Sequence, residues 1–134
     1  MAMAESNEKA ESRRVLDVGQ CGHDHGMITR LLAGFGARVD RVKSLEEAKR
    51  ALREARYDLV LVNRQLDADG SPGVDVVRAI KTDADPALAA VPVMLVSNFP
   101  EAQEEAVAAG ASPGFGKAEL DAPETKTRLA AVLG

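Results

Sequence analysis

Two short apolar runs dominate the hydrophobic pattern of this chain: LVLV at residues 59–62 and the apolar part of VPVMLVSN at residues 91–98. Runs this short and this continuously apolar are typical of strands buried on both faces, as in parallel sheets. The first run stops at Asn63. In open parallel sheets ligands bind just beyond the carboxyl ends of the strands, so Asn63 is the first candidate for a functional residue.

Weaker patterns around these runs complete an alternation of strands and helices. Apolar residues recur at helical spacing from about Asp24 to Gly36, and Ser44 with Glu47 forms the capping-box pattern that starts a second helix. Residues 82–90 are predicted to be a loop. The predicted strands are residues 15–18, 37–42, 58–63, 91–98 and 113–116, and the predicted helices begin near residues 24, 45, 74, 100 and 122. Such an alternation predicts an α/β fold in which helices cover both faces of a parallel sheet.

Composition limits the class of protein. The chain has 134 residues, 46% of them hydrophobic, and a mean hydropathy of -0.15, which are typical of one soluble globular domain. Residues 1–13 are polar and lack the apolar centre of a signal peptide, so we expect a disordered N-terminal tail, a domain over 14–134 and a cytoplasmic location. The single Cys21 permits no intramolecular disulfide, which agrees with a reducing compartment.

Charge and aromatic content argue against nucleic acid as a partner. The formal net charge is -4, whereas a nucleic-acid footprint needs clustered lysine and arginine. Aromatic residues make up 3% of the chain, too few for base-stacking platforms. No apolar run is long enough to span a bilayer, so a membrane is not expected as a partner either.

Three sequence motifs together resemble the receiver domains of two-component response regulators. They are YDLVLVN at 57–63, DPALAAVPVMLVSN at 85–98, and AVAAGAS at 106–112 with Lys117 five residues later. The resemblance covers almost everything after the tail. It implies a flavodoxin-like (βα)5 three-layer sandwich with a five-stranded parallel sheet of order 2-1-3-4-5, in which a phosphoryl group is accepted where strands one and three end.

The same resemblance assigns the pocket residues and shows where this sequence departs from the family pattern. It places the acidic pair on Gly19 and Gln20, the aspartate nucleophile on Asn63, the hydroxyl on Ser97 and the lysine on Lys117. All three carboxylates are therefore missing, and the loop after Asn63 is about two residues longer than usual. Phosphoryl transfer needs a nucleophile, and magnesium prefers carboxylate oxygens, so we expect no phosphorylation at Asn63, no bound magnesium or other cofactor, and no enzymatic activity.

The roles of Ser97 and Lys117, which match the family pattern, and of the unexpected acid Asp17 each allow two interpretations. Ser97 and Lys117 are retained either for packing and loop structure or for binding an anion. A buried lysine without acidic neighbours needs another counter-charge. Asp17 lies two residues before Gly19 on the same side of its strand. It either pairs with Lys117 or caps backbone groups locally.

The segment after the first strand carries ligand types that suit zinc or copper. Cys21, His23 and His25 lie close together in the sequence, but their spacing fits no established metal motif. The preferred interpretation is that these side chains are solvated or packed, so no metal is assigned. Cys21, His23 and His25 remain lower-ranked candidates for metal ligands.

The leading functional hypothesis is a single-domain signalling module that is independent of phosphorylation and acts through protein contacts. Because the chain ends just after the last predicted helix, no output domain is expected, and the partner would be a histidine kinase, another regulator or a second copy. The alternative is a small-ligand or metal-binding module that uses the altered pocket. In the family the partner face lies on the fourth helix, fifth strand and fifth helix. Here that face would hold Glu101, Glu104, Glu105, Ala108, Phe115 and Glu119.

Overall fold

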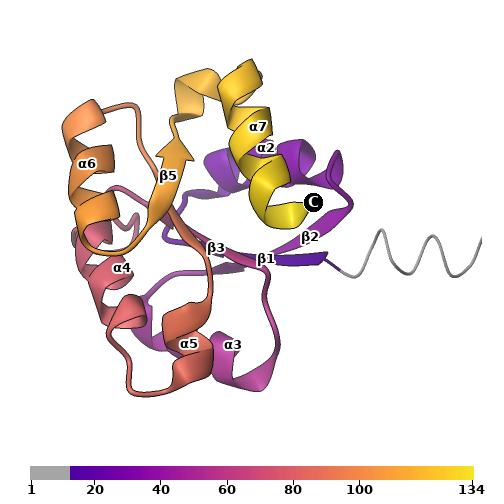
Figure 1. Ribbon diagram of the computed structural model, residues 1–134. Coiled ribbons are helices and arrows are strands. Elements are labelled where there is room, and N and C mark those ends of the chain that lie inside the picture. Colours follow the sequence, from indigo (N-terminus) through magenta and orange to yellow (C-terminus); the bar gives the residue numbers. More distant parts are fainter. Residues whose placement is uncertain (1–12) are drawn as a thin grey trace, which may run out of the picture.

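One parallel five-stranded sheet, in the order β2-β1-β3-β4-β5, forms the centre of the computed structural model, which describes residues 13–134 (Figure 1). The fold class and the strand order predicted above are confirmed. The strands are β1 (Arg13–Val18), β2 (Ala37–Val42), β3 (Leu59–Asn63), β4 (Val93–Val96) and β5 (Ser112–Phe115). The helices are α2 (Gly22–Ala33), α3 (Leu45–Glu54), α4 (Gly73–Lys81), α5 (Pro86–Ala90), α6 (Pro100–Ala108) and α7 (Pro123–Leu133), with a short 3-10 turn, η1 (Lys117–Glu119).

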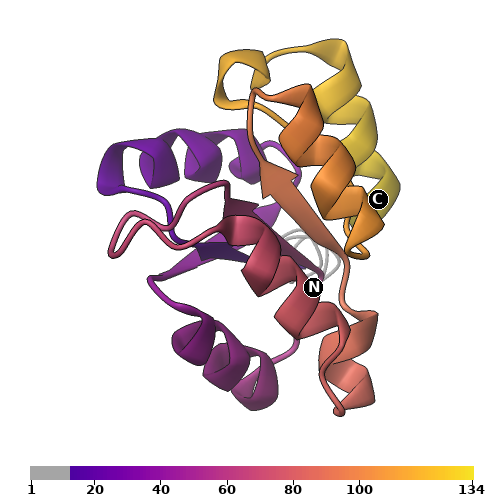
Figure 2. The same cartoon turned by 90° about the vertical axis from the view of Figure 1, so that its left-hand side faces the viewer.

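Alternate side chains of the central strands enter two separate cores. Val15 and Leu59 pack with α2 and α7 on one face, while Leu16 and Val60 pack with α3, α4 and α6 on the other. All four of these side chains are fully buried. This explains why β3 is apolar along its whole buried length. Helices α4 and α6 lie side by side on the second face (Figure 2).

The structure corrects several element boundaries. Helix α2 begins at Gly22, two residues before the predicted start, and β4 is shorter than the predicted strand 91–98. The predicted loop 82–90 contains α5, whose Asp85 carboxylate accepts a hydrogen bond from the Ala87 N–H at 3.0 Å. A five-residue helix carries too little apolar periodicity to be recognised from sequence.

The structure confirms that Ser44 caps the start of α3. The Ser44 hydroxyl accepts a hydrogen bond from the Glu47 N–H at 3.2 Å, as an N-cap should. The Glu47 carboxylate accepts from the N–H of Lys43, not from that of Ser44, so the reciprocal half of the capping box is displaced by one residue.

The structure tests the predicted N-terminal tail only at its last residue, Arg13. Residues 1–12 lie outside the described residues, so the predicted tail is not tested there. Arg13 already belongs to β1, one residue before the predicted start of the domain. Among residues 13–134, no helix is long and apolar enough to cross a membrane.

Candidate functional site

The carboxyl ends of β3, β4 and β5 enclose a polar cavity of about 290 Å³. Asn63, Ser97 and Lys117 all line it, so the structure brings together three of the five residues that the sequence assigned to one pocket. Gly19 and Gln20 follow β1, the strand next to β3, and Gly19 reaches the cavity through a contact with Asn63. The site therefore lies beside the switch point between β1 and β3, where ligands bind in folds of this kind.

Asn63 ties the end of β3 to the end of β1. Its side-chain Nδ2 donates a hydrogen bond to the Gly19 carbonyl at 3.1 Å, and the Asp67 N–H donates to the same carbonyl at 2.9 Å. A carboxylate has no hydrogen to donate when ionised. An aspartate at position 63 would face the Gly19 carbonyl with a second acceptor, so the amide is the side chain that fits this local structure.

Gly19 is required by its conformation and by a neighbouring side chain. Its φ angle is +80°, and a Cβ atom built there would lie 2.3 Å from Cδ2 of Leu66. Leu66 belongs to the lengthened loop after Asn63 and is only 3% exposed. The loop thus fills the space that a side chain at position 19 would need, which links the missing acid to the longer loop.

Ser97 has a structural partner within its own loop. Its hydroxyl accepts a hydrogen bond from the N–H of Phe99 at 3.1 Å, and the residue is 7% exposed. Phe99 is the N-cap of α6. Ser97 therefore helps to form the start of α6, which agrees with the first of the two interpretations given for it.

Lys117 finds its counter-charge on α2. Its Nζ lies 2.7 Å from Oδ2 of Asp24, in a half-buried ion pair. The hydrogen bond from Lys117 holds the pKa of Asp24 below its ordinary value. The prediction that Lys117 pairs with Asp17 is wrong, because the first turn of α2 starts earlier than expected and places Asp24 over the lysine.

Asp17 is fully buried and pairs with His25, so the prediction of a local backbone cap is also wrong. Its Oδ2 lies 2.8 Å from Nδ1 of His25, while Oδ1 has no hydrogen-bond partner among the described residues. Burial raises the pKa of Asp17 to about 6, even though His25, Gln20 and Lys117 oppose the shift. The sequence could not show this contact, since it depends on which side of α2 faces the sheet.

Gln20 is buried just after the end of β1, near Asp17. The residue is 4% exposed, and neither atom of its side-chain amide has a hydrogen-bond partner within residues 13–134. Its amide is near enough to Asp17 to lower the pKa of that carboxyl. Position 20 therefore supplies a neutral dipole next to a buried acid, in a place where the family pattern has a second acid.

The metal-ligand candidates after β1 do not form one cluster. Cys21 is the N-cap of α2, His23 is exposed, and His25 points inward to Asp17. In the described part of the chain, no three His, Cys, Asp or Glu side chains are arranged to hold a metal ion.

The predicted partner face is exposed except for one residue. Phe115 is 2% exposed and belongs to the core under α7, so including it on the surface was wrong. Sequence reasoning missed Phe99 and Val107, which are 53% and 44% exposed. They border a groove of about 650 Å³ between α6 and β5. The predicted members that remain on the surface are Glu101, Glu104, Glu105, Ala108 and Glu119.

The fold is shared with solved receiver domains, although no protein-family model and no curated protein matches the sequence. Chemotaxis protein CheY4 of Vibrio cholerae is 22% identical, with a TM-score of 0.69 over 90% of this chain and 98% of that one. The receiver domain of a sensor histidine kinase from Pseudomonas aeruginosa, solved with a magnesium ion in its active-site cleft, is 24% identical, with a TM-score of 0.65 over 90% and 93%. The signal receiver domain of a histidine kinase from Syntrophus aciditrophicus is 22% identical, with a TM-score of 0.66 over 90% and 92%. At these identities the likeness establishes the fold.

Proposed function

We propose that this chain, which has the receiver-domain fold, is a module of two-component signalling that works without phosphorylation of Asn63 and acts through protein contacts. The observation that carries the proposal is the hydrogen bond from the Asn63 amide to the Gly19 carbonyl, because it gives the residue at the phosphoacceptor position a structural role that a carboxylate cannot fill. We place the module in the cytoplasm, in keeping with its polar N-terminus and single cysteine.

The chemistry of the pocket supports the proposal. Its lining contains amides, a hydroxyl and two cations, and no carboxylate. Two acids close to the end of β1 are already paired, Asp24 with Lys117 and Asp17 with His25. A magnesium ion that used either carboxylate would have to compete with its partner. We therefore propose that the pocket neither binds magnesium nor catalyses phosphoryl transfer.

Incubation with acetyl phosphate and magnesium, followed by intact-mass measurement, tests this directly. We expect no mass increase of one phosphate, and no shift of the Asn63, Ser97 or Lys117 amide signals when magnesium and then beryllofluoride are added. Asn63→Asp is the informative companion variant, and we expect it also to remain unmodified because Gly19 and Gln20 supply no metal ligand. A phosphate mapped to the cavity of the natural chain would refute the proposal.

The groove between α6 and β5 is the surface we assign to a protein partner. Glu104 and Glu119 line it with negative charge, and Val107 adds exposed apolar area. Such a surface suits a partner that presents basic residues around an apolar centre. We propose a histidine kinase or another regulator.

Affinity capture with mutant controls tests this surface. Val107→Glu should abolish capture of a partner that contains a kinase or receiver domain. Glu46→Lys, on the exposed side of α3, should not. Equal capture by both variants and by the natural chain would place the contact elsewhere.

A small-ligand module is the second candidate, and the buried Gln20 amide, which has no hydrogen-bond partner within residues 13–134, favours it. A buried amide without partners costs stability that a bound molecule could restore. Anything that binds only the native state raises the melting temperature. Thermal melts with zinc, copper and inorganic phosphate would support this function if one of them raises the melting temperature in the natural chain and not in Gln20→Leu.

A further inference from the structure

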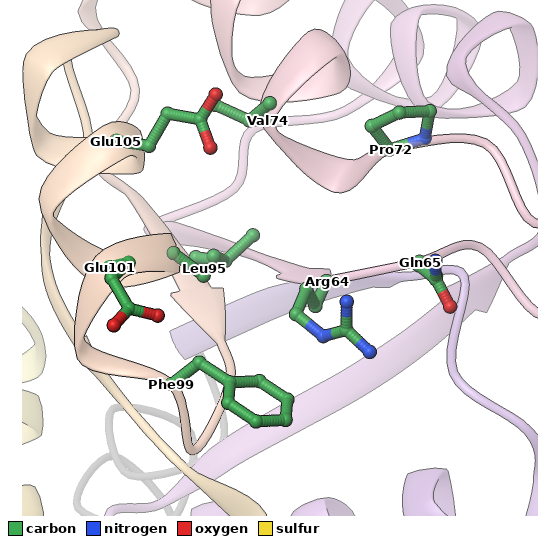
Figure 3. Close-up of a pocket in the computed structure, with 9 residues that line it drawn as sticks. Arg64, Gln65, Pro72, Val74, Leu95, Phe99, Glu101 and Glu105 are labelled. Atoms are coloured by element: carbon green, nitrogen blue, oxygen red, sulfur yellow. The ribbon is translucent and has the colours of Figure 1, made fainter.

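A second hollow, of about 390 Å³, lies on the other side of α6, between α6 and the loop that precedes α4 (Figure 3). Its walls and floor are largely apolar: Pro72, Val74, Leu95 and Ala102 all line it. The hollow shares Phe99 with the groove next to β5, and it shares Arg64, Gln65 and Phe99 with the polar cavity at the ends of β3, β4 and β5, but its apolar walls belong to neither. The function proposed above does not use this hollow.

Opposite charges face each other across the hollow. Arg64 comes from the end of β3, whereas Glu101 and Glu105 come from one face of α6, a single turn apart (Figure 3). None of the three forms an ion pair with another residue of the described chain, 13–134. The hollow therefore presents both a guanidinium and two carboxylates that are free to pair with an incoming surface.

The exposed aromatic ring of Phe99 lies at the rim of this hollow. Phe99 lines the hollow and is 53% exposed, and the guanidinium of Arg64 lies 4.8 Å from the centre of its ring. Removing the exposed half of this phenyl ring from water on contact with another molecule is favourable. Phe99 is thus a half-exposed ring, covered within the described chain by the Arg64 guanidinium and next to a hollow with an apolar floor.

We infer that a second copy of this chain occupies the hollow, in a two-fold symmetric dimer. In such a dimer one surface patch meets itself, so the patch must contain both members of every contact. This patch does: Phe99 of each copy can enter the hollow of the other, and Arg64 of each can meet Glu101 and Glu105 of the other. A partner of one charge sign would match only one wall of the hollow, whereas a second copy matches both.

The inference goes beyond the proposed function and does not depend on it. The dimer uses the side of α6 that faces α4, whereas the groove next to β5 lies on its other side and shares only Phe99 with the hollow. Association of copies can therefore be measured without phosphodonor, metal or partner.

Sedimentation velocity over a range of protein concentrations tests the dimer. We expect a reversible shift from the mass of one chain, 14.2 kDa, toward twice that mass, and a weaker dimer at high salt, since its ion pairs are screened. Phe99→Ala should raise the dimer dissociation constant roughly 10- to 100-fold. Val107→Ala removes the other exposed large apolar side chain and should leave it unchanged.

A charge exchange makes the test specific. Arg64→Glu alone and the double variant Glu101→Arg/Glu105→Arg should each be monomeric, because each places like charges opposite one another twice. An equimolar mixture of the two should form a dimer, because every contact between positions 64, 101 and 105 then joins opposite charges. Circular dichroism should show that both variants keep the native fold, as expected for exposed side chains.

Three results would overturn the inference. They are a single species of one-chain mass at every concentration, a dimer that Val107→Ala weakens and Phe99→Ala does not, and failure of the mixed charge variants to associate when the natural chain does. The first leaves the phosphorylation proposal untouched, so the two can fail separately.

Discussion

At the scale of single residues, three of the five predicted pocket residues line one cavity, and the prediction failed mainly in the contacts that they make. The assignment of Asn63, Ser97 and Lys117 to one site followed from their positions at strand ends, which a parallel sheet brings to one edge. Their partners could not be predicted, because the Lys117–Asp24 and Asp17–His25 pairs depend on the rotation of α2 against the sheet. The first turn of α2 carries both Asp24 and His25, so its orientation sets both ion pairs.

The glycine at the end of β1 provides the first prediction. Gly19→Ala should lower the free energy of unfolding by roughly 2 kcal/mol or more, since the new methyl group would meet Leu66 at an unfavourable positive φ. Chemical denaturation measures the change. Gly26→Ala is the matched control: a Cβ there meets nothing within 4 Å inside α2, so this variant should be neutral or more stable by up to about 1 kcal/mol. Equal effects of both substitutions would mean that Leu66 does not close over position 19.

The buried carboxyl of Asp17 predicts a pH dependence of stability. Its pKa in the folded chain is raised to about 6 from an ordinary 3.8, so between these values the folded chain holds a proton that the unfolded chain has released. The resulting stabilisation is present below about pH 4 and is lost as pH rises through 6, by on the order of 2–3 kcal/mol. Unfolding curves from pH 4 to 8 should show this decline in the natural chain and in the exposed control Asp121→Asn. Asp17→Asn should remove it, and an unchanged decline in that variant would assign the pH effect to another group.

At the scale of elements, long and strongly patterned segments were predicted well. The aliphatic run of β3 and the cap of α3 are both where the sequence placed them, because burial on two faces and a serine cap each leave a local signal. The first turn of α2 was missed since Gly22 and His23 carry no apolar periodicity, and its start depends on contacts with the sheet. Helix α5 was missed because of its shortness.

The α3 cap gives a prediction at this scale. Ser44→Ala should destabilise the chain by about 1 kcal/mol, because the N–H of Glu47 would lose its acceptor at the start of the helix. Ser44→Asp keeps an acceptor and should restore most of the loss. The midpoint of urea unfolding distinguishes them, and two equally weakened variants would show that the cap contributes through packing instead.

At the scale of the whole molecule, the fold could be predicted because alternation of strands and helices allows few topologies. The exposure of Phe99 and the burial of Phe115 could not, because Phe115 enters the core with β5 while Phe99 lies at the start of α6, and the sequence does not show which ring is buried. The sequence therefore predicted the helix of the proposed partner surface and not its exposed apolar residues.

Placing acids at positions 19, 20 and 63 should not create a magnesium site. We expect Gly19→Asp combined with Gln20→Asp and Asn63→Asp to bind magnesium no better than the natural chain, and to melt at a lower temperature. The reason is that Leu66 occupies the space beside position 19, and Asn63 loses its bond to the Gly19 carbonyl. Isothermal titration with magnesium measures binding. Saturable binding by the triple variant would show that the surrounding structure is still that of a working metal site.

The ion pair between Asp24 and Lys117 joins positions 93 residues apart. Closing so long a segment costs chain entropy before the contact returns any energy, and contacts of this kind slow folding. The pair can form only after β3, β4 and β5 have been laid down beside β1, since Lys117 follows the edge strand. During synthesis, a chain that has left the ribosome only as far as β4 still lacks Lys117 and cannot form this pair. We therefore expect the pocket to be completed late, so that a protease or chaperone acting before then would meet a form of this protein that lacks it.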